Sequence, residues 1–568
     1  MRYQAAVLAG LLIAGQARAA PDPTVAYSLK PVLTNGKLTS VAFEMRFYAP
    51  QAQTEIDLPD SWGGGTDFYR ALKDLEITGA SDISIPPDQP AHRLITAAPG
   101  AEIVIRYHLD ANRDAGEEAP ADTDMTYPVI GPDRFHILGQ QVWPTLAGDG
   151  DLPATFHADL PDGWTLASNL ENLAAIHGTD TNVKRSVMLA GRDVHITSAK
   201  TPNTQLRIAT AGTFDFPLSD FDDRVRRIIT TEQAFWGDGQ PDYLVTLVPI
   251  TATPGAQSNR GTGLGDAFAM MTAPDMPIAR ISVSLAHEYF HSWNIDRLGQ
   301  PEPDPDTATG YWFSEGFTDY YGRKLALKAG VISLEDFAAE WNEAMSRYAT
   351  SPHKTAPNAD VRDTYWQDPA WQKMPYDRGA LLAAYLNAEW RPKGMTLDRF
   401  MHALRDKVAV DPAFGTVPIH ERVEQVAADL GVPVSRELTR FIDKGDAIVL
   451  PPDAFGGCLQ VTTEDAPDVD FGYDRAASVQ TGVFAGVDPA GKAYAAGLRD
   501  GMTRIDRKGG DPFDSSVPVT FVVRDTAGRT LSVTYLPQGK TSHIRQRVVV
   551  PAGLSDAARA ACIAAVTG

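Results

Sequence analysis

Cysteine is almost absent from this chain, because only Cys458 and Cys562 occur among its 568 residues. Two cysteines so far apart cannot form a zinc site on their own, and the sequence leaves two alternatives open for them: one disulfide or two buried free thiols. Basic charge is also scarce, since 51 Lys and Arg face 72 Asp and Glu and give a net charge of −21 at pH 7. That balance argues against nucleic acid or anionic membranes as partners.

Long apolar runs are confined to the start of the sequence. Residues 1–20 place Arg2 before an apolar core at residues 5–14 and a small-x-small cleavage site at residues 17–19. This pattern predicts a cleaved secretory signal peptide rather than a transmembrane helix. No later run approaches the length of a membrane span. We therefore expect an exported protein, periplasmic or secreted, with no membrane span.

Histidine is scarce as well, with 12 in the chain, and this makes the spacing of His287 and His291 informative. With Glu288 they form the pattern H-E-x-x-H inside an apolar segment at residues 281–294, which we expect to be helical. Such a pattern should arise by chance only about 0.03 times in a chain of this composition. Residues four apart share one face of a helix, so the two imidazoles can bind one metal ion while Glu288 reaches a water molecule beside it. The alternative is a buried helix whose histidines are satisfied by hydrogen bonds.

Zinc suits this set, because imidazole nitrogen is a good zinc ligand and an open position leaves room for water. We expect one Zn²⁺ per chain, with Glu315 in the segment YWFSEGFTDYY (residues 311–321) as the third ligand. Ser314 is predicted to cap the helix that Glu315 opens, and Asp319 follows one turn later, placed to accept the second N–H of a ligand imidazole. The alternatives are a helix-dipole contact for Glu315 and an exposed charge for Asp319.

These motifs resemble those of the glycyl aminopeptidase family of PDZ-containing zinc metallopeptidases. The resemblance is carried by HEYFHSWN (residues 287–294) and WFSEGFTDYY, and the extension with Trp293 and Asn294 is more specific than H-E-x-x-H alone. The family has two His and one Glu on zinc and is related to thermolysin and to the aminopeptidase N-like enzymes. The resemblance implies an aminopeptidase that releases a small N-terminal residue, glycine or alanine, from oligopeptides.

The segment PYDRG (residues 375–379) is similar to one whose tyrosine hydrogen-bonds the oxyanion in aminopeptidase N-like enzymes. The resemblance therefore assigns Tyr376 to stabilising charge in the transition state. The alternative is a tyrosine packed at the start of a helix.

The segment TGLGD (residues 262–266) matches the family's G-G-L-E-H strand at Gly263 and Leu264 only. Gly265 stands where the family has the glutamate that binds the free amine of the substrate, and Asp266 is the only acid nearby. We expect Gly263, Leu264 and Asp266 to contact the substrate, with Asp266 brought inward by a one-residue bulge. If no acid replaces the glutamate, the enzyme does not recognise a free amine.

The whole chain is predicted to be multidomain α+β. The expected parts are the signal peptide (1–20), an N-terminal all-β sandwich-like domain (21–213), a thermolysin-like α+β catalytic core (214–330), an all-α subdomain that completes the active site (331–450), a PDZ-like β domain (458–550) and a C-terminal tail helix (551–568). The first domain rests on alternating apolar residues, as at residues 41–47 and 103–109.

The PDZ-like domain rests on AYAAGLRDGM (residues 493–502), which resembles a PDZ signature except that Met502 replaces an aspartate. Peptide C-termini or strands are its expected partners, by addition to a sheet edge, and a packing role is the alternative. The tail helix would tie back to the start of this domain if Cys458 and Cys562 are bonded.

Two other functions stay open beside the aminopeptidase with its peptide substrates. One is a zinc endopeptidase or processing protease that needs no free N-terminus, favoured by Gly265. The other is a non-catalytic PDZ-bearing peptide-binding protein. The presence of Glu288, Glu315 and Tyr376 together argues against the second.

Overall fold

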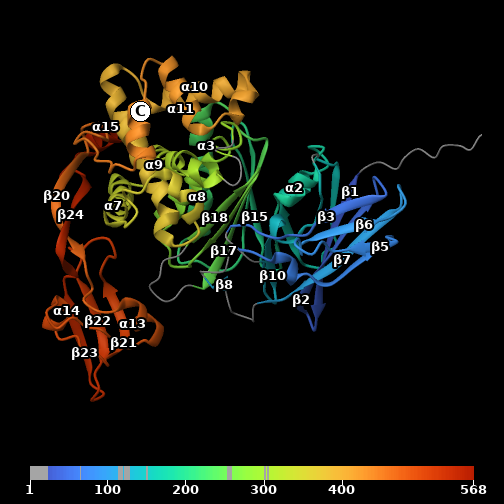
Figure 1. Ribbon diagram of the computed structural model, residues 1–568, viewed down its shortest axis with the longest axis horizontal. Helices are drawn as coiled ribbons and strands as arrows, with labels where there is room; N and C mark the ends of the chain where they lie inside the picture. Colours follow the sequence, from blue (N-terminus) through green and yellow to red (C-terminus); the bar gives the residue numbers. More distant parts are fainter. Residues whose placement is uncertain are drawn as a thin grey trace, which may run out of the picture. The chain divides into compact units, whose positions relative to one another are not determined.

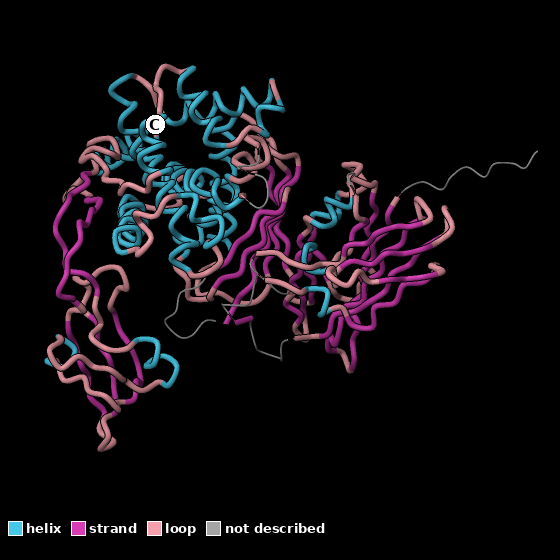
Figure 2. The backbone as a smooth tube through the Cα atoms, in the orientation of Figure 1, coloured by secondary structure: helices cyan, strands magenta, loops and turns pink. Residues whose placement is uncertain are grey.

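The computed structural model describes residues 24–63, 65–112, 119–120, 128–148, 151–251, 259–299, 302 and 306–568, so the predicted signal peptide lies outside the described residues. The chain divides into two compact units, residues 1–195 and 196–568 (Figure 1). The sequence predicted the end of the first domain at residue 213. The observed division comes earlier, because the strands just after residue 195 pair into the sheet of the second unit. The architecture is α+β, with several sheets and a helical region, as predicted (Figure 2).

The first unit is formed by three sheets. In order across the sheet, the first contains β12 (Ala154–Ala158), β1 (Val25–Thr34), β2 (Lys37–Tyr48), β7 (Glu102–Asp110) and β4 (Lys73–Thr78). The second contains β13 (Thr165–Ser168), β14 (Val187–Gly191), β10 (Arg134–Leu138) and β9 (Val129–Ile130). The third contains β11 (Thr145–Leu146), β3 (Gln53–Asp57), β6 (His92–Thr96) and β5 (Asp82–Ser84). Short helices η1 (Phe68–Ala71), α1 (Gly139–Val142), η2 (Asn169–Asn172) and α2 (Asp180–Lys184) connect them.

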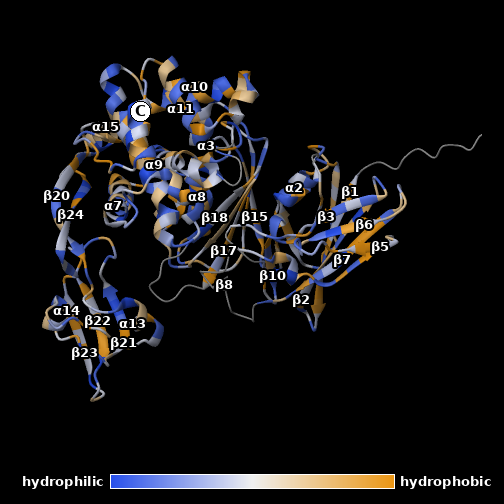
Figure 3. Cartoon of the chain, viewed as in Figure 1, coloured by the Kyte–Doolittle hydropathy of each residue, from blue (hydrophilic) through white to orange (hydrophobic). Residues whose placement is uncertain are grey.

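The predicted alternation of apolar residues is confirmed in β2 and β7. Every second residue from Val41 to Phe47 and from Ile103 to Leu109 is buried in one core, and Figure 3 shows hydrophobic and hydrophilic residues interleaved along the strands of this unit. The two strands pair antiparallel so that Phe43 lies opposite Tyr107, and the two rings stack with centroids 5.3 Å apart. A side-chain period of two with one buried face is what this pattern requires.

The second unit begins with a sheet in the order β15 (His195–Lys200), β16 (Gln205–Thr210), β17 (Asp242–Thr251), β19 (Ala267–Thr272) and β18 (Asn259–Leu264). Strands β16, β17 and β19 run parallel, and β18 is antiparallel to β19 at the edge of this order. Helix α3 (Leu218–Trp236) connects β16 to β17, as a parallel pair requires.

Helices follow the sheet and bury a large apolar core against it. They are α4 (Ile278–Phe290), η3 (Thr307–Gly310), α5 (Tyr311–Ser314), α6 (Gly316–Lys328), α7 (Leu334–Thr350), η4 (Asn358–Asp360), α8 (Val361–Thr364), α9 (Pro369–Trp390), η5 (Arg391–Lys393), α10 (Leu397–Val410), η6 (Pro412–Thr416), α11 (Ile419–Asp429), α12 (Ser435–Leu438) and η7 (Thr439–Asp443). Helix α4 ends at Phe290, earlier than the expected residue 294, because the chain turns from His291 onward.

The C-terminal part is β-rich. It contains β20 (Gln460–Val469) paired antiparallel with β24 (Gln538–Val549), a sheet in the order β21 (Thr503–Gly509), β22 (Val519–Arg524) and β23 (Thr530–Tyr535), and helices α13 (Arg475–Thr481), α14 (Lys492–Ala495) and α15 (Asp556–Thr567). A small separate core gathers around Phe484, Leu498 and Phe521.

Cys458 and Cys562 form a disulfide, which decides between the two alternatives that the sequence left open. The bond holds α15 next to the segment before β20. The same helix also lies against α6, where Lys328 Nζ donates a hydrogen bond to the carbonyl oxygen of Gly568 at 3.2 Å. The C-terminal helix therefore also packs on a helix of the predicted catalytic core, which the sequence did not indicate.

Among the described residues, none of the helices combines the length and hydropathy that a membrane crossing needs.

Candidate metal centre and active site

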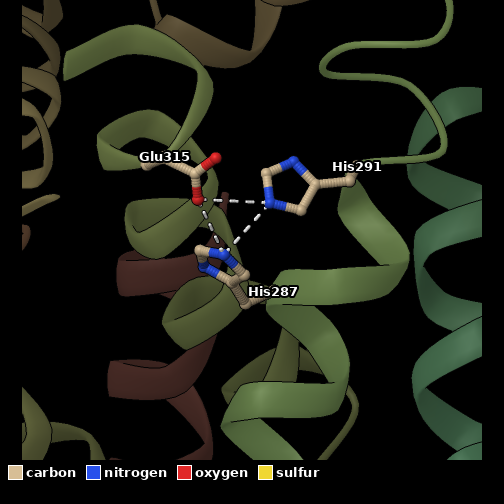
Figure 4. A group of neighbouring side chains, drawn as sticks. All are labelled: His287, His291 and Glu315. Carbon is tan, nitrogen blue, oxygen red and sulfur yellow. Dashed lines mark hydrogen bonds and ion pairs between the residues drawn. The ribbon is translucent and has the colours of Figure 1, made fainter. Parts of the chain in front are cut away.

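The side chains of His287, His291 and Glu315 converge on one point (Figure 4). His287 lies in the last turn of α4, and His291 caps that helix with helical φ and ψ of −60° and −21°, so both imidazoles project from one side. Glu315 is the single residue between α5 and α6. The two Nε2 atoms are 3.1 Å apart, and Oε2 of Glu315 lies 3.3 Å from Nε2 of His287 and 3.4 Å from Nε2 of His291.

These separations fit a zinc ion. Zn²⁺ binds imidazole nitrogen and carboxylate oxygen at about 2.0–2.1 Å in a tetrahedron, which makes the edges about 3.3–3.4 Å long. The three observed edges are 3.1, 3.3 and 3.4 Å, and the three side chains are only 11–14% exposed. Three nearly buried donor atoms at this spacing can hold a metal cation between them, and the fourth corner of the tetrahedron is left for a water molecule or a substrate.

Asp319 orients the imidazole of His287, which is the role that the sequence predicted for this residue. Its Oδ1 lies 2.8 Å from Nδ1 of His287, and its Oδ2 accepts a hydrogen bond from Arg323 at 3.1 Å. A proton on Nδ1 leaves the Nε2 lone pair for the metal. Burial by itself would raise the pKa of Asp319, but Arg323 and His287 hold that pKa well below its usual range, so Asp319 is an acceptor.

The charges of the metal-binding side chains support one another. Burial by itself would lower the pKa of His287, but its hydrogen bonds to Asp319 and Glu315 raise the pKa to about 10, so a metal ion that binds Nε2 has to displace a proton from this ring. Burial would raise the pKa of Glu315, but His291 and His287 lower it well below its usual range. Glu315 is therefore ionised at any physiological pH, as a metal ligand must be.

Asn294 fixes the position of Glu315, a role that sequence reasoning missed. Its side-chain amide is fully buried and donates to the carbonyl oxygens of Phe313 and Ser314, both at 3.2 Å, and to the hydroxyl of Thr318 at 2.8 Å. These bonds tie the end of the α4 segment to the junction of α5 and α6. The family resemblance had drawn attention to Asn294, but nothing local in the sequence indicates its partners.

Ser314 is not the cap of α6, which corrects the expectation from the sequence. It lies inside α5, and its buried hydroxyl has no hydrogen-bond partner in the described part of the chain. Glu315 occupies the cap position of α6 with φ −95° and ψ −47°, so the chain passes from one helix into the next without the extended residue that a serine cap adopts.

Glu288 points at the edge strand β18. Its Oε2 accepts a hydrogen bond from the backbone N–H of Gly263 at 3.0 Å, and one turn earlier Ser284 accepts from the side chain of Asn259 at 2.6 Å. A Cβ at Gly261 would lie 3.4 Å from Cγ of Glu288, and one at Gly263 would lie 3.7 Å from its Oε2. The strand therefore has no side chain where it faces the carboxylate of Glu288.

Gly265 and Asp266 form the two-residue turn between β18 and β19. The register is regular up to the pair Leu264 and Ala267, so the strand contains no bulge that would bring Asp266 inward. Only the first turn residue has a positive φ, 66° at Gly265, which is the pattern of a type II′ hairpin turn. A glutamate would be strained at this position, so the missing family glutamate follows from the turn geometry.

Tyr376 lies beside the metal site. Its ring is nearly parallel to the imidazole of His287, with centroids 6.1 Å apart. It lies inside α9, which begins at Pro369 with Asp368 as its cap, so Tyr376 is not at the start of a helix. Burial, with the nearby charge of Glu315, raises the pKa of Tyr376 well above its usual value, which keeps the phenol protonated and able to donate.

Comparison with known proteins agrees with these observations. Residues 281–382 match the M61 glycyl aminopeptidase family, which confirms the resemblance in the segment that contains the metal site and Tyr376. No curated protein matches the chain at a significant level. Among solved structures, an aminopeptidase N family protein from Idiomarina loihiensis is similar over 96% of this chain and 100% of its own, with 16% identity and a TM-score of 0.68. The M1 zinc metallopeptidase from Deinococcus radiodurans is similar over 76% of this chain and 95% of its own, with 16% identity and a TM-score of 0.48.

The first of these likenesses shows that the chain has the fold of an aminopeptidase N family protein. The family match supports a peptidase, whose substrates are peptides.

Proposed function

We propose that this protein is a zinc-dependent aminopeptidase. The proposal rests chiefly on one observation: His287, His291 and Glu315 place three donor atoms at the spacing of three corners of a zinc tetrahedron. Glu288 is close enough for its charge to act on both imidazoles. The same triangle without an acid next to it would suit a structural metal site. A carboxylate next to the open position is what hydrolysis requires.

Zn²⁺, when bound, supplies a Lewis acid that polarises the scissile carbonyl and acidifies a water molecule. Glu288 takes the proton from that water as it attacks and then passes the proton to the leaving nitrogen. Tyr376 donates its hydroxyl proton in a hydrogen bond to the oxygen that gains negative charge. Asp319 keeps the His287 ring in the tautomer that the site needs.

Strand β18 holds the substrate. It is the last strand in the order β15-β16-β17-β19-β18, and it lies along α4 next to Glu288. A peptide in extended conformation can add to such an edge through main-chain hydrogen bonds, with Gly263 and Leu264 alongside it. Bare glycines on the side of Glu288 leave room for the scissile bond to approach.

Recognition of the free amine of the substrate separates an aminopeptidase from an endopeptidase. Asp266 is the acid nearest to the family's glutamate position, and we assign it to the amine because a buried ammonium needs a carboxylate. The competing function is a zinc endopeptidase or processing protease, which the turn at Gly265 favours. One assay separates them: kcat/KM for a single peptide with and without N-terminal acetylation. An aminopeptidase loses activity on the acetylated peptide, whereas a ratio near one leaves the endopeptidase.

Further parts of the proposal rest on the sequence and its resemblance. We assign small N-terminal residues, glycine or alanine, as the preferred substrates, and export to the periplasm or outside the cell as the location. The β-rich C-terminal part is proposed to be PDZ-like and to bind peptide C-termini or strands. Cleavage of a library of peptides that differ in their first residue tests the substrate preference. Mass spectrometry of the N-terminus of the exported protein tests the location.

A further inference from the structure

Lys373 is a cation in the active site that the proposed mechanism does not use. It lies one turn before Tyr376 in α9, its side chain is exposed, and its Nζ is 4.8 Å from the centre of the Tyr376 ring. Its charge interacts with those of Asp319 and Glu315, so this ammonium group lies near the metal site, although burial and the charge of Arg347 lower the pKa of Lys373.

The other cations around the site have carboxylate partners. Arg323 is bound to Asp319 at 3.1 Å, and Arg347 forms two hydrogen bonds to Asp377 at 2.6 and 2.8 Å. No described carboxylate lies within ion-pair distance of Lys373, although the chain has 72 acidic residues for 51 Lys and Arg. Its charge does reach the site, because Lys373 contributes to lowering the pKa of Asp319. An unpaired ammonium group beside a substrate position attracts an anionic part of the substrate.

Apolar surface accompanies this charge. Trp371 and Met374 of α9 form a cluster with Tyr365, against which Tyr311 and Tyr376 also pack. In the turn between β18 and β19, Gly265 has no side chain that could carry the family's acid. The site therefore differs from the family's pattern at Gly265 and carries an additional cation on α9.

We propose that Lys373 binds a carboxylate of the substrate, the free α-carboxylate of a short peptide, one residue beyond the scissile bond. This assignment rests on the proposed peptidase function and names its substrate class as dipeptides with a free C-terminus. In a dipeptide the carboxylate is two bonds from the scissile nitrogen, so an ammonium group next to Tyr376 can reach it while Tyr376 contacts the scissile carbonyl oxygen. An acidic side chain on the same residue would present the same chemistry.

The test compares kcat/KM for Ala-Ala with that for Ala-Ala amide, and for Ala-Asp amide with that for Ala-Asn amide, in the zinc-loaded full-length protein. The wild type is expected to prefer the first member of a pair, and Lys373→Met to reduce that preference about tenfold or more, since a charge-assisted hydrogen bond is lost. Lys373→Arg should keep most of the preference. Lys393→Met, at an exposed lysine in η5, is the control for net charge.

A Lys373-dependent preference in the first pair assigns the site to the α-carboxylate, and one in the second pair alone assigns it to an acidic side chain. The proposal is overturned if Lys373→Met lowers the rate equally for both members of both pairs, since Lys373 would then only support the ring of Tyr376. Calorimetric binding of Ala-Ala and Ala-Ala amide to zinc-loaded Glu288→Gln, with and without Lys373→Met, separates the two claims. Carboxylate-dependent binding without any cleavage by the wild type would contradict the peptidase function and leave the Lys373 site standing.

Discussion

Gly316 and Gly379 touch each other where α6 crosses α9. A Cβ added to Gly316 would lie 2.4 Å from Cα of Gly379, and one added to Gly379 would lie 1.8 Å from the carbonyl oxygen of Trp312. Real side chains do not approach backbone atoms so closely, so only glycine fits at either position. This crossing joins the helix that follows Glu315 to the helix that contains Tyr376, and it therefore sets the distance between the metal site and the tyrosine.

Gly379→Ala is expected to separate α6 from α9 and displace Glu315. Overpacking of this kind costs about 1–3 kcal/mol or more in the free energy of unfolding, because the contact is with backbone that cannot rotate away. The zinc affinity should fall together with the thermal midpoint, which differential scanning calorimetry and a zinc titration measure. Glu389→Ala, at an exposed position of the same helix, should change neither. Unchanged zinc affinity in Gly379→Ala would show that the crossing does not position Glu315.

Asp319→Asn tests the support of the metal ligand His287. The amide has nearly the same shape, but it no longer provides a charged acceptor for Nδ1 of His287 and for Arg323. Loss of such a carboxylate typically weakens metal affinity about 10–100-fold. A competition titration with a chelator measures the zinc dissociation constant, with Asp363→Asn, whose carboxylate is 74% exposed, as the control. Equal dissociation constants for Asp319→Asn and the wild type would rule out this role.

Tyr376→Phe should keep the zinc content and lose rate. The hydroxyl contacts the substrate oxygen mainly after negative charge has developed, so kcat should fall about 10²–10³-fold with little change in KM. Steady-state kinetics with an alanyl peptide measures both constants. Tyr385→Phe, in the same helix and away from the site, should behave like the wild type. A Tyr376→Phe enzyme with wild-type kcat would remove this residue from the mechanism.

The disulfide should stabilise the second unit rather than support catalysis. It links residues 104 apart, and a loop of that length can contribute up to about 4–5 kcal/mol in the chain-entropy account. The double variant Cys458→Ser and Cys562→Ser should therefore unfold at a lower temperature, while its zinc affinity at 25 °C stays the same. The thermal midpoint with and without reductant measures the effect. A midpoint for the oxidised wild type that matches the double variant would contradict it.

The metal-binding residues could be predicted because their spacing follows from one periodicity. His287 and His291 are four apart on a helix, and Glu315 and Asp319 repeat that spacing on the next one. Asn294 could not be assigned in this way, because its partners are backbone carbonyls about twenty residues later in the chain. Every residue has a backbone carbonyl, so the sequence does not show which ones accept these hydrogen bonds.

The turn at Gly265 could have been predicted, since Gly-Asp between two apolar segments is a signal for a two-residue hairpin. Comparison with the family's strand directed attention to the missing glutamate instead. The start of α9 is a similar case. Asp368 and Pro369 are an ordinary N-cap and first-turn proline, so the start of α9 could have been predicted there. The alternative considered for Tyr376 instead placed the start of a helix next to Pro375.

The central claim is that Glu288 works as the base of a zinc peptidase, and the most direct test is peptide turnover by Glu288→Gln beside the wild type, each with its zinc content measured. The account predicts about one zinc per chain in both proteins, cleavage of an alanyl peptide by the wild type, and turnover at least 10²–10⁴-fold lower in the variant, because the amide cannot accept the proton from water. A zinc-loaded Glu288→Gln protein that cleaves the peptide at the wild-type rate would contradict the account.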